Sequence, residues 1–179
     1  MSRAHPAAVV PPGAGVRAEI RHFTTVVKVG AVHTDGAYCV LEHTLDPGYV
    51  AMPLHSHRRE SKTLYVLSGT LTVQHGDDVS RLAAGATVIV PPGTPYTFWN
   101  ERPLAPSERD GRAPGEVARF LGVAAPAGLE SYYQAVAVHI PAQGPPDVEA
   151  ILAVSGDYGI EVDMRSLLDI VERYGVALA

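Results

Sequence analysis

The chain has 179 residues, a length that suits one domain with a substantial hydrophobic core. Its apolar content of 46% and its charged content of 18% are ordinary for a globular protein. A net charge of -5 argues against nucleic acid or an anionic membrane surface as a partner, and the single cysteine excludes an internal disulfide framework.

Residues 1–20 are expected to form a flexible arm. The opening sequence MSRAHPAAVVPPGAGVRAE has no sustained apolar core, and Pro11 and Pro12 interrupt it early, so it lacks the pattern of an export signal. No apolar run in the chain approaches the roughly 20 residues that a membrane-spanning helix needs. We therefore expect a cytoplasmic protein that does not enter a membrane.

Residues 21–135 have the pattern of a single all-β domain. Strands are expected at residues 24–32 and 37–45, joined by a hairpin turn whose Asp-Gly pair favours a tight reversal. Further short strands are expected in TLYVLSG, TLTVQHG, VSRLAAG, ATVIVPPG and TPYTFWN, and a closing strand at residues 117–126. Residues 101–116 are charged and rich in proline and glycine, which predicts an exposed loop.

Residues 136–179 are expected to form a short helical extension that contains an internal repeat. AILAVSGDYGIEV matches SLLDIVERYGVAL, and each unit has the pattern of a short amphipathic helix that ends at a glycine, Gly159 or Gly175. The simpler expectation is that both helices cover the β-domain. A lid, or a contact between the subunits of a homodimer, is the alternative.

Two histidines, His55 and His57, stand one residue apart in the segment PLHSH. Side chains at positions i and i+2 of a strand point to the same face, so both imidazoles can enter one cavity. Such a pair is the usual start of a metal site. The nearest carboxylate, Glu60, is out of phase on a strand and is expected on the opposite face, unless a turn between Arg58 and Ser61 brings it back.

Two motifs around these histidines resemble those of the cupin superfamily. The first motif of cupins, with its His-x-His pair between two glycines, is matched in part by GYVAMPLHSHRRESKTLYVLSG. The second is matched at every spacing by Gly85, Pro91, Gly93 and Asn100 in GATVIVPPGTPYTFWN. The chain thus resembles a single-domain, quercetin-dioxygenase-like cupin. The resemblance implies one antiparallel, jelly-roll-like β-barrel, followed by a helix in PAGLESYY.

The resemblance also implies a divalent metal, which would be iron, nickel, manganese or zinc, but this chain departs from the usual ligand set. Aligning TLYVLSG with the matching cupin segment puts Lys62 in place of the glutamate ligand, and Tyr96 stands in place of the third histidine. An ammonium group at Lys62 would repel a cation. No cofactor is therefore favoured, and a metal held by His55 and His57, with Glu60 as a further ligand, is the alternative.

The same residues suit acid–base chemistry without a metal. A buried lysine is a competent base or Schiff-base amine, a tyrosine hydroxyl can donate a proton, and imidazoles shuttle protons near neutral pH. His55, His57, Lys62 and Tyr96 are therefore the candidate catalytic residues. They predict an isomerase, lyase, dehydratase or cyclase that acts on a small oxygenated metabolite.

Three further residues are expected to bind the substrate, namely Leu64, Phe98 and Tyr132. Leu64 shares a strand face with Lys62, Phe98 shares one with Tyr96, and Tyr132 follows the barrel near its mouth. The remaining histidines are expected on surfaces or strand ends. They are His22, His33, His43, His75 and His139.

Two other functional classes remain open at this point. One is a metal-dependent, quercetinase-like dioxygenase that uses His55 and His57, which the overall resemblance implies. The other is a non-catalytic cupin that binds a small ligand, which a closed or featureless pocket would favour. In every case the expected partner is a small molecule, and a homodimer is open as the assembly.

Overall fold

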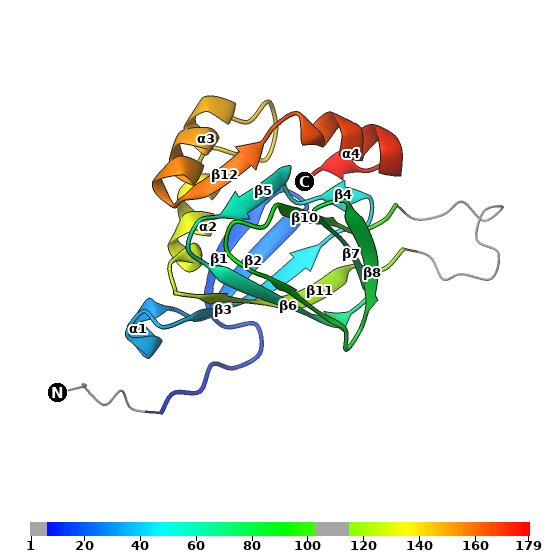
Figure 1. The fold of residues 1–179 in the computed structure, drawn as a ribbon. Helices are drawn as coiled ribbons and strands as arrows, with labels where there is room; N and C mark the ends of the chain where they lie inside the picture. The colour runs from blue at the N-terminus through cyan, green and yellow to red at the C-terminus, as the bar shows by residue number, and fades with distance from the viewer. Residues whose placement is uncertain (1–6, 103–114) are drawn as a thin grey trace.

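The structure is a computed structural model that describes residues 7–102 and 115–179, and it consists mainly of β-strands (Figure 1). The strands are β1 (Val16–Ile20), β2 (Phe23–Val29), β3 (Cys39–Leu45), β4 (Tyr49–Val50), β5 (Leu54–His57), β6 (Ser61–Ser68), β7 (Thr70–His75), β8 (Asp78–Ala83), β9 (Thr87–Val90), β10 (Tyr96–Trp99), β11 (Ala118–Ala125), β12 (Ile160–Asp163) and β13 (Ala177–Leu178). The helices are α1 (Ala31–Thr34), α2 (Leu129–Ala137), α3 (Val148–Asp157) and α4 (Ser166–Tyr174).

The strands form two sheets that face each other across one core. The first sheet has the order β1-β2-β3-β11-β6-β9. The second runs β12-β5-β10-β4-β13, and the hairpin of β7 and β8 joins it through β10. Apart from the parallel pairing of β13 with β4, the described strand pairs are antiparallel. The predicted all-β, jelly-roll-like architecture is confirmed.

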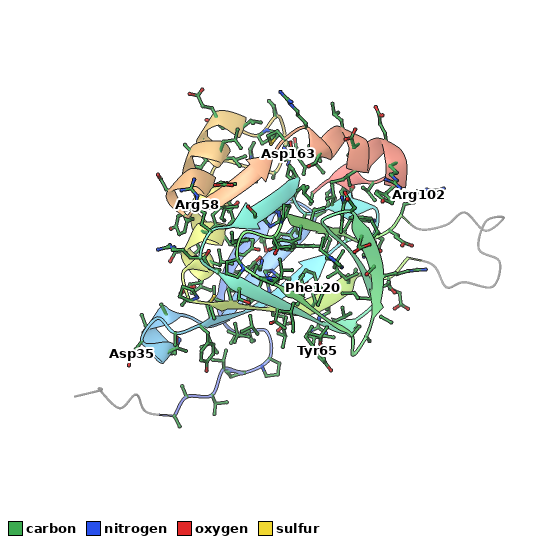
Figure 2. The ribbon with its side chains drawn as sticks, viewed as in Figure 1. Asp35, Arg58, Tyr65, Arg102, Phe120 and Asp163 are labelled. Atoms are coloured by element: carbon green, nitrogen blue, oxygen red, sulfur yellow. The ribbon has the colours of Figure 1, made fainter. Side chains whose placement is uncertain are left out.

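The alternation of residues along β6 decides which side chains enter the core. Lys62, Leu64 and Val66 are buried, whereas Tyr65 is 42% exposed. Figure 2 shows Tyr65 pointing away from the sheets and Phe120, on the neighbouring strand β11, pointing between them. The period of two that is read from the sequence therefore holds on this strand.

The N-terminal segment is ordered closer to the start of the chain than predicted. The expected flexible arm ends at residue 20, but Val16–Ile20 form β1, which pairs with β2 from Val16 opposite Val27 to Ile20 opposite Phe23. The prediction was wrong for these residues because Ala18 and Ile20 alternate with charged residues and enter the core. Residues 1–6 lie outside the described part of the chain.

The connection between the next two strands is also different from the prediction. Instead of the predicted hairpin turn, the short helix α1 follows β2, and its C-cap is Asp35, whose φ of 51° is left-handed. Gly36 continues the turn with a φ of 79°, a conformation that glycine adopts without steric cost. Of the predicted loop at residues 101–116, positions 103–114 lie outside the described residues.

The C-terminal extension contains the two predicted helices, α3 and α4, and the glycines that follow them have positive φ angles of 71° at Gly159 and 62° at Gly175. Each repeat then continues into a strand that the sequence reading missed. β12 pairs with β5, and β13 pairs with β4. These strands cover sheet edges that would otherwise present unpaired backbone groups.

A second hydrophobic cluster joins α4 to the outer face of the second sheet. It consists of Val50, Trp99, Ile170 and Val176, with the ring of Tyr174 centred 4.4 Å from that of Trp99. Because α4 covers this face, β10 is buried on both sides, which its four consecutive buried residues reflect. Within residues 7–102 and 115–179, no helix has both the length and the apolar character to cross a membrane.

Candidate active site

A cluster of polar side chains occupies the interior between the two sheets. β5 contributes His55 and His57, β6 contributes Lys62, β10 contributes Tyr96, and α2 contributes Tyr133. None of these five residues is more than 4% exposed. The structure therefore brings all four candidate catalytic residues together and adds Tyr133, which lies about 70 positions further along the chain.

Three rings pack closely within this cluster, tilted or edge-on to one another. The imidazole centroids of His55 and His57 are 5.3 Å apart, and the ring of Tyr96 is centred 4.3 Å from that of His55. His55 Nδ1 lies 2.9 Å from the carbonyl oxygen of Pro53, and the Tyr96 hydroxyl lies 3.2 Å from His57 Nε2. Tyr96 stands directly opposite His55 in the pairing of β10 with β5, so strand register sets this contact.

Lys62 is a buried cation among aromatic rings. Its Nζ donates a 3.4 Å hydrogen bond to the hydroxyl oxygen of Tyr133, and it lies 5.6 Å from the ring centroid of Tyr96. Burial lowers the pKa of Lys62 to about 8, against an opposing effect from Cys39 and Glu60. The amine and ammonium forms are therefore both accessible near neutral pH.

The two histidines are neutral in this environment. Burial, followed by the charge of Lys62, lowers the pKa of His55 to about 3 and that of His57 to about 2. Burial also raises the pKa values of Tyr96 and Tyr133, so both phenols keep their protons. The cluster consequently holds one group that changes charge near pH 8 and several neutral groups that accept or donate hydrogen bonds.

Glu60 reaches the interior, contrary to the expectation that it points to the opposite face. The turn after β5 brings its carboxylate back, so that it is 3% exposed and its Oε2 lies 3.7 Å from His57 Nδ1. The reason is that Arg58 and Arg59 leave the strand, which breaks the alternation on which the prediction depended.

The metal that the cupin resemblance implies does not fit these residues as they are arranged. Glu60 approaches Nδ1 of His57, whereas the other nitrogen of that ring faces Tyr96, so one ion cannot contact both the carboxylate and Nε2. The Lys62 charge acts on both imidazoles. Among the described residues, no three histidine, cysteine or acidic side chains are close enough together to hold an ion.

A cavity of about 90 Å³ adjoins the cluster. Two of the predicted substrate-binding residues, Phe98 and Tyr132, lie on its wall, and the third, Leu64, is packed in the core instead. Lys62, Tyr96 and both histidines are not among the residues that line this cavity. Tyr133 connects the two, because it lines the cavity and its hydroxyl accepts a hydrogen bond from Lys62. Most of the other wall residues are apolar, among them Met52, Val136, Ile151, Val162 and Met164, and the wall also includes the polar residues Arg21 and Ser155.

His43 is a residue that the sequence reading placed wrongly. It was expected at a surface or strand end, but it is fully buried on β3, with Nδ1 2.9 Å from Thr25 Oγ1 and Nε2 against Gly122. The sequence does indicate that His43 is buried. It stands at every second position with Cys39, Leu41 and Leu45 along CVLEHTL, and these residues alternate with less buried ones. The rings of His43 and Tyr133 pack in a T-shaped arrangement with centroids 5.3 Å apart, so His43 supports a residue of the cavity wall.

The second motif and the strands around it match a known family. Residues 41–105 match the family described as Cupin domain. This part of the chain is a cupin domain. The cupin fold places β5, β6 and β10 around one interior, which is where the polar cluster lies.

Solved structures with the same fold resemble the chain at low sequence identity. KdgF from Halomonas sp. is 13% identical with a TM-score of 0.56, and the match covers 70% of this chain and 99% of that one. The nucleoside dehydratase Pac13 from Streptomyces is 17% identical with a TM-score of 0.51, over 70% and 88%. The cupin domain of Schizosaccharomyces pombe Cnp3 is 15% identical with a TM-score of 0.50, over 69% and 76%. No curated protein matches the chain significantly in sequence.

Proposed function

We propose that this cupin is a small-molecule enzyme that transfers protons without a metal, as an isomerase, lyase, dehydratase or cyclase. The observation that carries the proposal is Lys62, a fully buried lysine whose pKa of about 8 lets it act as a donor or as a base near neutral pH. A charged group that is buried away from water lowers the stability of the fold, and residues that lower stability in this way are typical of functional sites.

The substrate is expected in the cavity beside Tyr133. Its apolar walls favour a small, largely apolar molecule, with one carbonyl or hydroxyl oxygen directed at the Tyr133 hydroxyl. Lys62 donates to that hydroxyl and thereby makes it a stronger donor toward the substrate oxygen.

Dehydration is one reaction that this set of groups suits, because it needs one group to remove a proton and another to protonate the departing hydroxyl. Pac13 is a nucleoside dehydratase on the same fold, so in that protein the cupin frame supports a dehydration. Its likeness to this chain is in the fold alone, and the apolar cavity does not favour a nucleoside as the substrate here.

A second candidate function is non-catalytic binding of a small apolar ligand. The observation that favours it is the position of the cavity, whose wall includes Tyr133 but not Lys62 or either histidine of β5. In that case Lys62 would only orient Tyr133. The two candidates differ in what Lys62 does after the ligand has bound.

The test uses chelator-treated protein, kept under strict anaerobiosis, with a panel of small carbonyl and hydroxyl compounds. We expect turnover that Lys62→Met abolishes and that Tyr133→Phe lowers by roughly 10²- to 10⁴-fold, because Tyr133 lines the cavity and is the partner of Lys62. Lys28→Met is the matched control, because Lys28 lies on β2 and bonds to the carbonyl oxygens of Pro11 and Ala14, outside the site. It should retain full activity.

Two outcomes would overturn the proposal. Turnover that stops when oxygen and metal are removed would favour a metal-dependent dioxygenase. Saturable binding without turnover, unchanged in Lys62→Met, would favour the non-catalytic alternative.

A further inference from the structure

Glu60 has a position that suggests a role other than metal binding. Its Oε2 and the Nδ1 of His57 are 3.7 Å apart, and both residues are at least 96% buried. Within the part of the chain that the structure describes, neither atom has a hydrogen-bond partner. Two unpartnered buried polar atoms this close together mark a direct hydrogen bond that a small side-chain rotation completes.

The other nitrogen of His57 is engaged by Tyr96. Its Nε2 lies 3.2 Å from the Tyr96 hydroxyl. A neutral imidazole has one N–H and one bare nitrogen, so its tautomer decides the direction of this bond. If Nε2 is bare, Tyr96 donates its proton to His57. If Nε2 carries the proton, Tyr96 accepts from His57 and its own proton is free for another acceptor.

We propose that Glu60 is a positioning residue that holds the proton of His57 on Nδ1, so that Nε2 accepts the hydroxyl proton of Tyr96. A carboxylate is an acceptor only, and it therefore selects the Nδ1–H tautomer. The Arg59 guanidinium, 3.7 Å from the other oxygen of Glu60, places positive charge beside that carboxylate. Arg59 is 70% exposed, so solvent weakens this contribution.

The consequence is a division of the cluster into two halves. On one side, the Lys62 ammonium donates to the Tyr133 hydroxyl, which leaves the proton of Tyr133 free for an acceptor in the cavity that Tyr133 lines. On the other side, the Tyr96 proton is committed to His57, so the Tyr96 oxygen presents lone pairs and accepts from its surroundings. This assignment rests on the proposed function for its catalytic meaning, but the tautomer itself can be observed without any substrate.

The experiment is ¹⁵N nuclear magnetic resonance of histidine-labelled protein at neutral pH, which distinguishes a protonated ring nitrogen from a bare one by its shift. The His57 signals are assigned through bonds to the backbone. In the wild type we expect the Nδ1–H form to exceed the Nε2–H form by roughly tenfold or more, the preference that one charge-assisted hydrogen bond imposes. Glu60→Leu should remove most of that preference.

Tyr96→Phe is the matched control, because it removes the partner of Nε2 and leaves Glu60 in place. It should retain the Nδ1–H form. A wild-type His57 protonated on Nε2, or an unchanged ratio in a folded Glu60→Leu variant, would overturn the inference. If Glu60→Leu does not fold, the wild-type spectrum still decides between the two tautomers.

The two proposals fail in different ways. If wild-type His57 shows no preference for the Nδ1–H form but turnover depends on Lys62, the role of Glu60 is rejected and the proposed function stands. If wild-type His57 is in the Nδ1–H form but no compound is turned over, the role of Glu60 stands and the proposed function is rejected.

Discussion

At the scale of single residues, Lys62 is the side chain whose environment most opposes its ordinary state. The phase of β6 directs it into the interior with Leu64 and Val66, and the ring faces of Tyr96 and Tyr133 offer only partial compensation for lost water. An apolar residue in place of Lys62 would therefore make the folded protein more stable. That conflict yields a measurable prediction.

Lys62→Met is expected to stabilise the protein at pH 7 by about 1–3 kcal/mol. A lysine whose pKa falls from 10.5 to about 8 on folding destabilises the folded state by about 3 kcal/mol at neutral pH, and the lost Tyr133 bond returns part of this. The gain should shrink as pH rises from about 8 to 10.5, because the unfolded lysine then also loses its charge.

Urea unfolding at several pH values measures this effect, with Lys28→Met as the control that gains no stability. Destabilisation by Lys62→Met at pH 7 would mean that the lysine is fully compensated by its neighbours, and the proposed function would lose its main support.

Gly122 is a second residue whose identity the packing requires. A Cβ at this position of β11 would lie 2.7 Å from His43 Nε2, and His43 cannot withdraw easily because it is fully buried and bonded to Thr25. Gly122→Ala is therefore expected to cost about 1–3 kcal/mol in thermal or urea unfolding. Gly156→Ala in α3, where the new Cβ meets nothing within 4 Å, should instead stabilise by about 0.5–1 kcal/mol. Equal effects of the two changes would contradict this account.

At the scale of elements, the C-terminal extension completes the second sheet. β12 lies along β5, with Val162 opposite His55 and Ile160 opposite His57. The same extension contributes Ile151, Val162 and Met164 to the cavity wall. The helices and strands beyond the cupin motifs therefore stabilise the strand that carries the histidines and enclose the proposed substrate site.

The chain's single tryptophan reports the docking of α4. Trp99 is fully buried against Ile170 and Tyr174 of that helix. Ile170→Asp places a charge in this cluster and should release α4, so that tryptophan fluorescence shifts to longer wavelength. Leu168→Asp, on the 67% exposed side of the helix, should leave the emission unchanged. Similar spectra for both variants would contradict the packing described here.

At the scale of the whole molecule, the buried histidines determine how the protein responds to acid. His43, His55 and His57 are neutral in the fold, with pKa values far below 6.5 because of burial and the charge of Lys62. The unfolded chain takes up protons at these histidines below about pH 6.5. In the folded chain His43 does so only at a much lower pH, and His55 and His57 do so only near pH 3 and pH 2. The contribution of these histidines to the free energy of unfolding is therefore fully present above pH 6.5 and decreases as the pH falls.

Each of these histidines is expected to lower the free energy of unfolding by about 1.4 kcal/mol per pH unit between about pH 6 and pH 5. Urea unfolding across this range gives the slope, and His55→Gln should reduce it by about a third. A free energy of unfolding that does not change between pH 7 and pH 5 would show that the imidazoles are charged or solvated in the fold.

The sequence alone determined the local features of the site. The His-x-His spacing puts two imidazoles on one face of β5, and the period of two puts Lys62 in phase with Leu64. The spacing of the second motif identified the β9–β10 region, and the glycines of the repeat marked the ends of α3 and α4. These features were predictable because strand alternation and helix termination depend on neighbouring residues.

Only the tertiary structure decided which distant groups meet. Tyr133 of α2 receives the Lys62 bond, Glu60 turns back to His57, and β12 pairs with β5. None of these contacts follows from local periodicity, because each depends on where the chain returns after a turn or a helix. Packing selects such partners over the whole molecule: a buried ammonium and a buried imidazole require partners, and the fold supplies them from segments that the sequence keeps apart.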